Sequence, residues 1–342
     1  MTDQNATTTK ARQGALGGLR FDPKLIFATI IEKHLIWALL AALILIGLAM
    51  PGFMSTRNLV NVMWAAAPLG CMVLGLFFVI LTGGLDLSLE STFALAPTVA
   101  VVVFTSTLAE YIWPGFAILL VPLLGALVGW VNGMFSVKLG VSAFLVTLGT
   151  LLIMRGIVIY LIPEGVYYLP DEITFLGKAR LWGVLPVAVI VWIVLYILAF
   201  IAINYHRLGK DIFALGNNEE AAFIAGVNVS RTKVTCFAIA GMLASIGGLL
   251  EVGRLTSVVA DMGEGDILMV FAGTILGGAA LTGGAGTVGG IFAAVLVIAI
   301  IENLMNLYGV EPSIRQIVFG VILMCAIYLA SLQGKLRNWR KD

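Results

Sequence analysis

Residues 59–81 read LVNVMWAAAPLGCMVLGLFFVIL and contain no Asp, Glu, Lys or Arg. A helix needs about 20 apolar residues to cross the hydrocarbon core of a bilayer, which is about 30 Å thick. The run is therefore long enough for one crossing. Similar runs recur along the whole chain, in which 60% of the residues are hydrophobic and 11% are charged. Soluble domains carry about 25% charged residues, so the composition predicts a membrane protein.

Within a bilayer the backbone must satisfy its own hydrogen bonds, which restricts spanning structures to helices and closed barrels. Barrel strands alternate in polarity, whereas these runs are unbroken. The predicted fold class is therefore all-α integral membrane, with about ten transmembrane helices and glycine-rich breaks. The predicted crossings are 34–50, 59–81, 87–108, 114–137, 143–163, 183–203, 234–253, 264–280, 287–308 and 313–332.

The distribution of basic residues predicts the orientation of these crossings. Lys and Arg are enriched in cytoplasmic loops, and most of the 20 basic residues fall on the cytoplasmic side if the chain begins there. We expect one transmembrane domain, 34–333, between cytoplasmic tails at 1–33 and 334–342. Residues 204–233 form the one sizeable cytoplasmic loop, and 163–182 form an exposed extracytoplasmic loop.

Two glycines interrupt the second apolar run, where residues 81–91 read LTGGLDLSLES. Ionisable residues within a bilayer cost about 2.5–3.5 kcal/mol on insertion scales, and broken helices line solute paths in transporters. One interpretation places Asp86, Ser88 and Glu90 beside a translocation pathway. The other is that Asp86 only caps the third helix at the cytoplasmic interface.

Two further charges fall at apolar positions. Arg155 lies inside the fifth run, and Asp266 opens the eighth. Both could line the same polar path. Ion pairing between helices is the alternative explanation for charges buried in this way.

The cytoplasmic loop contains a short predicted helix at residues 216–226, GNNEEAAFIAG. Asn217 or Asn218 can cap its free N–H groups, and Glu219 and Glu220 complement its positive end. Gly226 can take the left-handed conformation that ends a helix. This helix is too short to span a membrane.

A second glycine-rich segment, residues 277–290, reads GGAALTGGAGTVGG. It contains G-x-G-x-x-G, but the βαβ context of a dinucleotide site is missing. Closely spaced glycines let helices approach, so we expect helix packing here, and likewise at Gly125, Gly129 and Gly133 and at the pair Gly273 and Gly277.

The sequence offers no catalytic or metal-binding constellation. It lacks G-x-S-x-G, H-E-x-x-H and G-x-x-x-x-G-K-[ST], the central motifs of hydrolases, metalloproteases and nucleotide-hydrolysing domains. Its three cysteines and two histidines have no metal-ligand spacing. We therefore predict no enzymatic activity and no metal site, with the energy supplied by another protein or by an ion gradient.

Three segments resemble the permease subunits of bacterial ribose/xylose/galactose-type ABC importers, which share the branched-chain amino acid permease superfamily. They are residues 83–88, GGLDLS; residues 207–222 and 226–229, RLGKDIFALGNNEEAA and GVNV; and residues 276–290, LGG…GG…GTVGG. With the matching hydropathy, the resemblance covers nearly the whole chain.

The resemblance implies a type II ABC importer-like bundle in the bacterial inner membrane. Two permeases, in a homodimer or pseudo-dimer, would sit on two ATPase subunits and receive solute from a soluble substrate-binding protein. No cofactor is expected in this chain, since ATP and Mg would be bound by the partner ATPase, and no nucleic-acid partner is expected. The helix from Glu219 to Gly226 would dock into the ATPase. The implied coupling residues are Arg207, Lys210, Asn217, Asn218, Glu219, Glu220, Ala221, Ala222 and Gly226.

The predicted function is thus import of a monosaccharide or similar small polar solute. Residues 89–90 are Leu-Glu where the family commonly has Val-Gly, which leaves nucleoside, autoinducer or amino-acid cargo open. Two other classes remain as alternatives. An ion-coupled secondary carrier would use the broken helices and buried acids, and an intramembrane enzyme would use Asp86 and Glu90.

Overall fold

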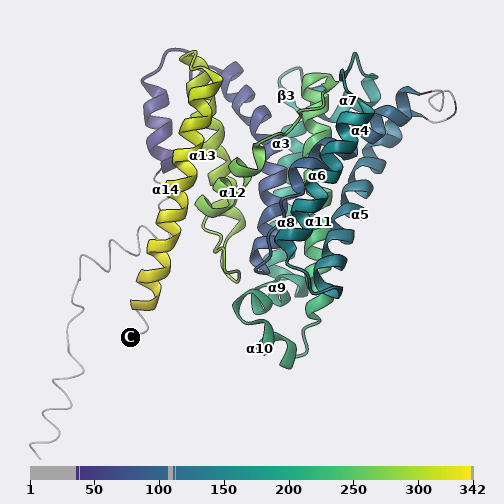
Figure 1. Ribbon diagram of the computed structural model, residues 1–342. Coiled ribbons are helices and arrows are strands. Elements are labelled where there is room, and N and C mark those ends of the chain that lie inside the picture. Colours follow the sequence, from purple (N-terminus) through teal and green to yellow (C-terminus); the bar gives the residue numbers. More distant parts are fainter. Residues whose placement is uncertain (1–35, 38, 107–110, 112, 340–342) are drawn as a thin grey trace, which may run out of the picture.

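The computed structural model describes residues 36–37, 39–106, 111 and 113–339 (Figure 1). The predicted N-terminal tail, 1–33, lies outside the described residues, as do residues 340–342 of the predicted C-terminal tail. Nearly all described elements are helices, and the four strands have two residues each. The all-α fold class is confirmed.

Six helices in the described part are long and apolar enough to cross a membrane. They are α3 (Thr56–Leu81), α5 (Ala117–Lys138) with the 3-10 turn η2 (Pro114–Phe116) before it, α6 (Ala143–Leu161), α8 (Val187–Tyr205), α11 (Val229–Leu255) and α13 (Val288–Leu307). The shorter apolar helices are Leu39–Leu48, α4 (Leu89–Thr105), α12 (Asp266–Leu276) and the segment Ser313–Tyr328 of α14 (Pro312–Trp339). These helices lie at the ten predicted crossings, but how many cross stays a prediction.

Several helix boundaries differ from the expected ones, among them those of α11, α12 and α14. Helix α11 begins earlier than predicted because the Asn228 side chain caps it, accepting a hydrogen bond from the backbone N of Arg231 at 2.9 Å. Helix α12 ends earlier, at Leu276, because Gly278 adopts a left-handed conformation with φ +89°. Helix α14 continues to Trp339, through most of the stretch predicted as a tail.

The stretch predicted as an exposed extracytoplasmic loop, 163–182, is structured. It contains β1 (Val166–Tyr167), α7 (Asp171–Lys178) and β2 (Arg180–Leu181). Strand β1 pairs antiparallel with β4 (Ser257–Val258), and β2 pairs with β3 (Leu185–Pro186). Gly177 of α7 lies so close to Gly253 of α11 that a Cβ on Gly253 would be 2.6 Å from the Gly177 Cα. The prediction of an exposed loop is therefore wrong for α7, whose packed face is buried.

Helix α11 is the centre of the bundle and contacts α5, α3, α4 and α7. The share of buried residues in the apolar window is 83% for α3 and 72% for α11, against 17% for α6. Helix α6 therefore presents most of its apolar surface outward. Since apolar side chains facing outward are stable in lipid and not in water, this distribution agrees with a membrane-embedded bundle.

Glycines bring α5 and α11 into close contact, as the sequence predicted. A Cβ on Gly129 would overlap the carbonyl group of Phe237, and one on Gly125 would overlap the carbonyl oxygen of Gly241. A Cβ on Gly133 would lie 2.9 Å from the Cα of Val234. Small residues at such positions allow the two backbones to approach.

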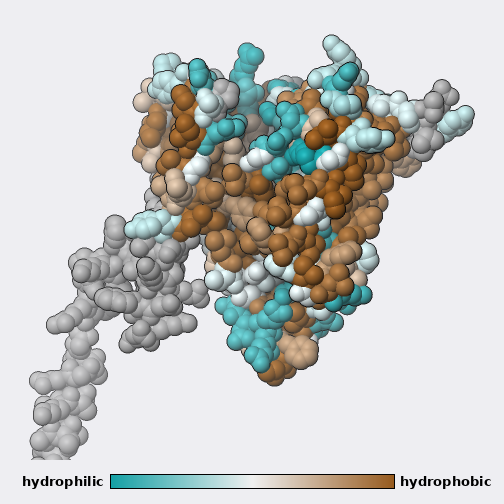
Figure 2. All heavy atoms as spheres, viewed as in Figure 1, coloured by the Kyte–Doolittle hydropathy of each residue, from teal (hydrophilic) through white to brown (hydrophobic). Residues whose placement is uncertain are grey.

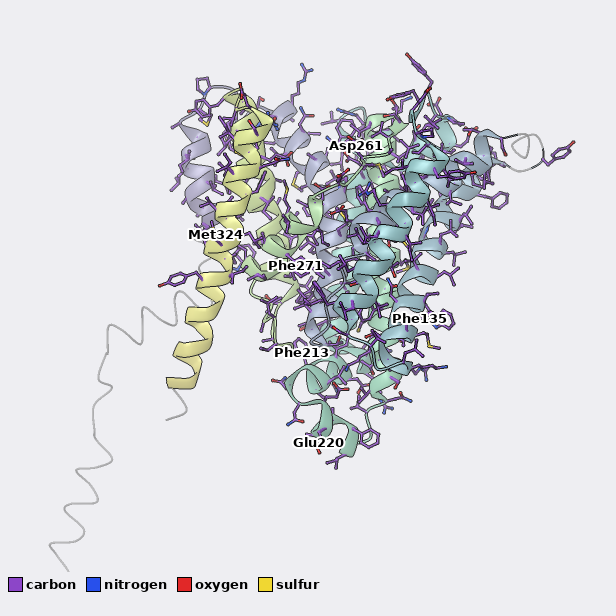
Figure 3. The ribbon with its side chains drawn as sticks, in the orientation of Figure 1. Phe135, Phe213, Glu220, Asp261, Phe271 and Met324 are labelled. Carbon is purple, nitrogen blue, oxygen red and sulfur yellow. The ribbon has the colours of Figure 1, made fainter. Side chains whose placement is uncertain are left out.

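The surface has a broad hydrophobic middle and hydrophilic ends (Figure 2). Helices α9 (Arg207–Asn217) and α10 (Glu219–Ile224) form the lower end in Figure 1, which we call the α9–α10 end. Figure 3 shows Glu220 at this end and Asp261 at the opposite one.

Candidate functional site

The first glycine-rich break is a non-helical connection between α3 and α4. Gly83 has φ +75°, which ends α3, and residues 84–87 carry no regular structure before α4 begins at Leu89. The break thereby exposes backbone groups to side chains of other helices. The backbone N of Leu87 donates to the Thr147 hydroxyl of α6 at 3.1 Å.

Asp86 is completely buried in this connection. Its Oδ1 accepts hydrogen bonds from the backbone N of Ser88 at 2.9 Å and from the Ser88 hydroxyl at 2.6 Å. Its Oδ2 has no hydrogen-bond partner among the described residues. Asp86 thus bonds to Ser88 and not to an N–H inside α4, which has no side-chain cap. The interpretation of Asp86 as a helix cap is therefore wrong, and its depth in a membrane stays a prediction.

A chain of polar side chains continues from Ser88 across two helices. The Asn132 side chain of α5 donates to the Ser88 hydroxyl at 2.8 Å, and the Thr150 hydroxyl of α6 donates to Asn132 Oδ1 at 2.7 Å. Asp86, Ser88 and Asn132 are all buried. The sequence analysis did not single out Asn132 or Thr150. In the sequence they were recognisable only as an amide and a hydroxyl side chain inside two apolar runs.

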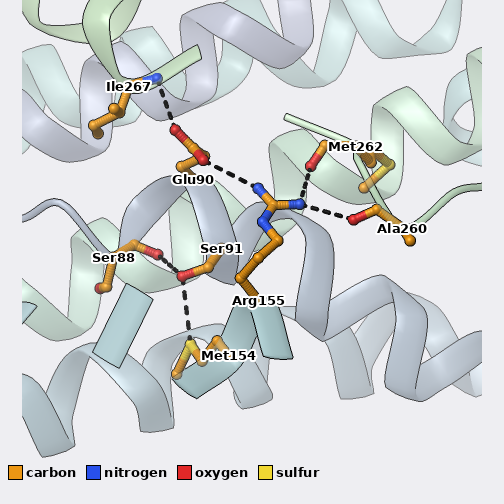
Figure 4. Close-up of polar contacts among 8 residues, drawn as sticks. All are labelled: Ser88, Glu90, Ser91, Met154, Arg155, Ala260, Met262 and Ile267. Carbon is orange, nitrogen blue, oxygen red and sulfur yellow. Dashed lines mark hydrogen bonds and ion pairs between the residues drawn. The ribbon is translucent and has the colours of Figure 1, made fainter. Parts of the chain in front are cut away.

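Glu90, in the first turn of α4, forms an ion pair with Arg155 of α6 (Figure 4). Arg155 Nη2 lies 3.1 Å from Glu90 Oε1, and the two side chains are 12% and 7% exposed, respectively. Arg155 Nη1 donates to the carbonyl oxygens of Ala260 and Met262, both at 3.0 Å. The pairing explanation is thus confirmed for Arg155. The same contacts tie α6 and α4 to the segment that precedes α12.

Asp266 lies beside this pair without joining it. Its carboxylate makes no hydrogen bond or ion pair in the described part of the chain, but it interacts electrostatically with Glu90, Arg155, Glu251 and Glu302. The nearest structural link is the backbone N of Ile267, 3.4 Å from Glu90 Oε2. The structure therefore groups the five predicted pathway residues into two adjacent clusters along the start of α4. One cluster holds Asp86 and Ser88, and the other holds Glu90 and Arg155 with Asp266 nearby.

The predicted helix of the 204–233 loop is present but shorter than expected. Asn218 is extended, with φ −162°, and divides residues 207–224 into α9 and α10. Its side chain caps α10 by accepting from the backbone N of Ala221 at 2.9 Å. Gly226 has φ +85°, and the backbone N of Val227 donates to the Ala222 carbonyl at 3.0 Å, which is a Schellman-type stop. Both predicted end signals are confirmed.

Helix α10 exposes two apolar side chains that were not among the predicted coupling residues, and it buries one residue that was. Phe223 and Ile224 of α10 are 71% and 80% exposed, whereas Ala222 is buried. Figure 2 shows hydrophobic atoms at the tip of the α9–α10 end. Arg207 and Lys210 lie in the first turns of α9, and Lys233 of α11 holds Glu219 in an ion pair at 2.7 Å.

The second glycine-rich segment has a different role from the one predicted. Gly283, Gly284 and Gly286 all have positive φ and form a loop between α12 and α13. The backbone N of Gly284 donates to the Leu81 carbonyl at 3.0 Å, and the Asn217 side chain donates to the Gly284 carbonyl at 3.2 Å. The expectation of helix packing holds for Gly277 and Gly290 and is wrong for the middle of the segment.

We call this contact of three backbones the glycine junction. It joins the end of α3, the end of α9 and the loop before α13. A Cβ on Gly216 would overlap both the Leu81 carbonyl oxygen and the Gly284 backbone N, and one on Gly283 would lie 2.8 Å from the Gly83 backbone N. Only glycine fits such contacts. The α9–α10 end is thereby connected to the break that carries Asp86.

In the part of the chain that the structure describes, no group of three or more His, Cys, Asp or Glu side chains is arranged to hold a metal ion. The candidate site therefore consists of the polar chain around Asp86, the pair of Glu90 and Arg155, and the helices at the α9–α10 end.

Comparison with known proteins gives one consistent family. The family described as branched-chain amino acid transport system / permease component matches residues 58–327. The ribose import permease protein RbsC of Escherichia coli (strain K12) is 32% identical over 305 residues, 88% of this chain and 94% of the relative. The L-arabinose transport system permease protein AraH of the same strain is 34% identical over 290 residues, 84% of this chain and 87% of the relative.

A third relative, the galactose/methyl galactoside import permease protein MglC of Salmonella typhimurium, is 33% identical over 306 residues, 83% of this chain and 89% of the relative. No solved structure matches the chain. The matched family segment runs from α3 into α14 and so includes both glycine-rich breaks and the α9–α10 end. This chain therefore belongs to the family of branched-chain amino acid transport system permease components.

Proposed function

We propose that the chain is the membrane-spanning permease subunit of an ATP-binding cassette importer that moves a monosaccharide. The observation that carries the proposal is the α9–α10 end. There a separately capped helix exposes Phe223 and Ile224, and the glycine junction ties the preceding helix to the break in the bundle. Exposed large apolar residues on an otherwise polar surface are typical of a docking site.

The substrate class follows from the relatives and from the polar chain. The three relatives are named for import of ribose, L-arabinose and galactose. These sugars present several hydroxyl groups, which hydrogen-bond to carboxylates, amides and hydroxyls. The hydrogen-bonded side chains of Asp86, Ser88, Asn132 and Thr150 offer a carboxylate, an amide and hydroxyls in an otherwise apolar bundle.

We place Asp86, Ser88, Glu90, Arg155 and Asp266 along the solute path. A buried polar atom without a partner costs about 1–3 kcal/mol, so an unmet acceptor such as Asp86 Oδ2 favours a site that receives a partner at some stage of the cycle. A sugar hydroxyl can donate to that oxygen. Glu90 and Arg155 would separate when the path widens, because their contacts join α4 and α6 to the segment before α12.

The energy would come from partners. In this proposal the chain does no bond chemistry and binds no cofactor, and an ABC ATPase subunit holds ATP and Mg and docks on α10. A second permease copy completes the membrane unit, and a soluble substrate-binding protein delivers the sugar at the opposite end. The chain lies in the bacterial inner membrane with both termini cytoplasmic, so that the α9–α10 end faces the ATPase.

Motion of the docked helix would pass through the glycine junction. Helix α9 reaches the end of α3 and the loop before α13 at the same point, and backbone atoms make most of these contacts. Closely packed backbone groups transmit displacement because they have no flexible side chains to absorb it. A shift of α9 would therefore change the connection that holds Asp86.

The test is uptake of radiolabelled ribose, L-arabinose and galactose by cells that lack the gene for this chain. We expect uptake of at least one sugar to fall and to recover when the chain is supplied on a plasmid. Cells that lack the partner ATPase should show the same loss. Unchanged uptake of all three sugars would contradict the substrate class.

A further inference from the structure

A groove with a volume of about 500 Å³ runs between α5 and α11 on the outside of the bundle. It follows from the glycine contacts between the two helices, which bring the backbones together and leave larger side chains on either side. On α5 the wall is formed by Trp130 and Met134, which are four residues apart and so share a face. Ala126 and Ala238 are small and leave the space open.

Two cations stand at one end of the groove. Lys138 is in the last turn of α5, and Arg231 is in the first turn of α11. Both side chains are free of ion pairs and side-chain hydrogen bonds within the described ranges. The groove is thus apolar along its length and positively charged at its mouth. Because α11 follows α10 directly, the mouth lies toward the α9–α10 end.

The groove also has a defined length. Residues 126 to 138 of α5 cover about 18 Å at a rise of about 1.5 Å per residue. One leaflet of the hydrocarbon core is about 15 Å thick, half of the full core. An acyl chain that lies along Trp130 and Met134 therefore brings its headgroup to the level of the two cations.

We propose that this groove binds one anionic phospholipid, with the phosphate between Lys138 and Arg231 and an acyl chain against Trp130. Charge complementarity selects this occupant, because basic pockets between membrane helices bind anionic headgroups. The Ser230 hydroxyl at the mouth adds a hydrogen-bond donor for the phosphate. This site is separate from the solute path and does not depend on the proposed transport activity.

Native mass spectrometry of the full chain, purified with equal amounts of dioleoyl phosphatidylglycerol and dioleoyl phosphatidylcholine, tests the proposal. We expect the chain to retain phosphatidylglycerol in preference. Each cation near a membrane surface contributes roughly fivefold to binding of an anionic lipid, so the double variant Lys138→Gln with Arg231→Gln should bind phosphatidylglycerol about 30-fold more weakly. Both substituted side chains are exposed, so the fold should be unaffected.

Two matched variants separate the groove from general surface charge. The double variant Arg207→Gln with Lys210→Gln loses the same charge at the same end but leaves the groove unchanged, and it should retain phosphatidylglycerol. Ala126→Phe fills the groove without a change of charge and should release the lipid. The proposal is overturned if the wild-type chain shows no preference, if the control loses the lipid equally, or if Ala126→Phe retains it.

Discussion

Replacing Gly216 with alanine is expected to uncouple ATP hydrolysis from transport without preventing docking of the ATPase. The new Cβ would overlap the Leu81 carbonyl oxygen and the Gly284 backbone N, and it would lie 2.9 Å from the Gly284 Cα. Unbonded carbon atoms prefer about 3.5–4.0 Å. The glycine junction must therefore open by several tenths of an ångström or more, and the atoms in the way are backbone atoms.

The expected magnitude follows from two hydrogen bonds. Opening the junction removes those from Gly284 to Leu81 and from Asn217 to Gly284, at about 1 kcal/mol each. Alanine is a better helix former than glycine by about 1 kcal/mol, but Gly216 lies inside α9 whether the junction is open or closed, so this preference does not offset the loss. The closed junction should lose about 2 kcal/mol, which corresponds to a roughly 30-fold shift in its equilibrium.

The assay is the ratio of sugar imported to ATP hydrolysed in proteoliposomes that contain this chain, its ATPase and the binding protein. The Gly216→Ala variant should show a ratio several-fold below that of the wild-type chain, with the ATPase still copurifying. Gly320→Ala is the matched control, because Gly320 is helical and a Cβ added to it would have no neighbour within 4 Å. A wild-type ratio for Gly216→Ala would refute the role of the junction.

Three further substitutions test the other parts of the site. Ala222→Pro removes the hydrogen bond from the Ala222 backbone N to the Asn218 carbonyl and destabilises helix α10 by about 3 kcal/mol. The ATPase should therefore no longer copurify, and undiminished copurification would show that α10 is not the docking helix. Asp86→Asn keeps the size of the side chain but removes its charge, and should slow sugar uptake at unchanged melting temperature; identical uptake kinetics would exclude Asp86 from the path. Arg155→Met leaves Glu90 buried without its partner and should lower the free energy of unfolding by about 3–5 kcal/mol. Adding Glu90→Gln should restore much of the lost stability, and a melting temperature of Arg155→Met equal to that of the wild-type chain would contradict this prediction.

The helices themselves could be predicted because their signal is local. Apolar runs located α3, α5, α8 and α13, and the caps around α10 were legible as Asn, Glu and Gly at fixed spacing. The predicted helix ends were wrong where a single residue, and not the apolar pattern, determines where the helix begins or ends. Asn228 extends α11 into polar sequence, and the left-handed glycine at 278 stops α12 within an apolar run.

The site could be predicted only in part because its contacts are remote in sequence. Glu90 and Arg155 are 65 residues apart, and Asn132 lies 44 residues from Ser88. No spacing rule connects such positions, so the sequence identified the charges but not their partners. The glycine junction was missed for the same reason. Gly283 and Gly284 were taken as helix-packing residues, although their left-handed backbone shapes a loop that meets α9.

The most direct test of the account is uptake of labelled sugar into proteoliposomes that contain the purified chain, with and without its ATPase, under ATP or under a proton or sodium gradient. The account predicts accumulation only when the ATPase, ATP and binding protein are all present. Accumulation driven by an ion gradient in the absence of the ATPase would contradict it and would identify the chain as a secondary carrier.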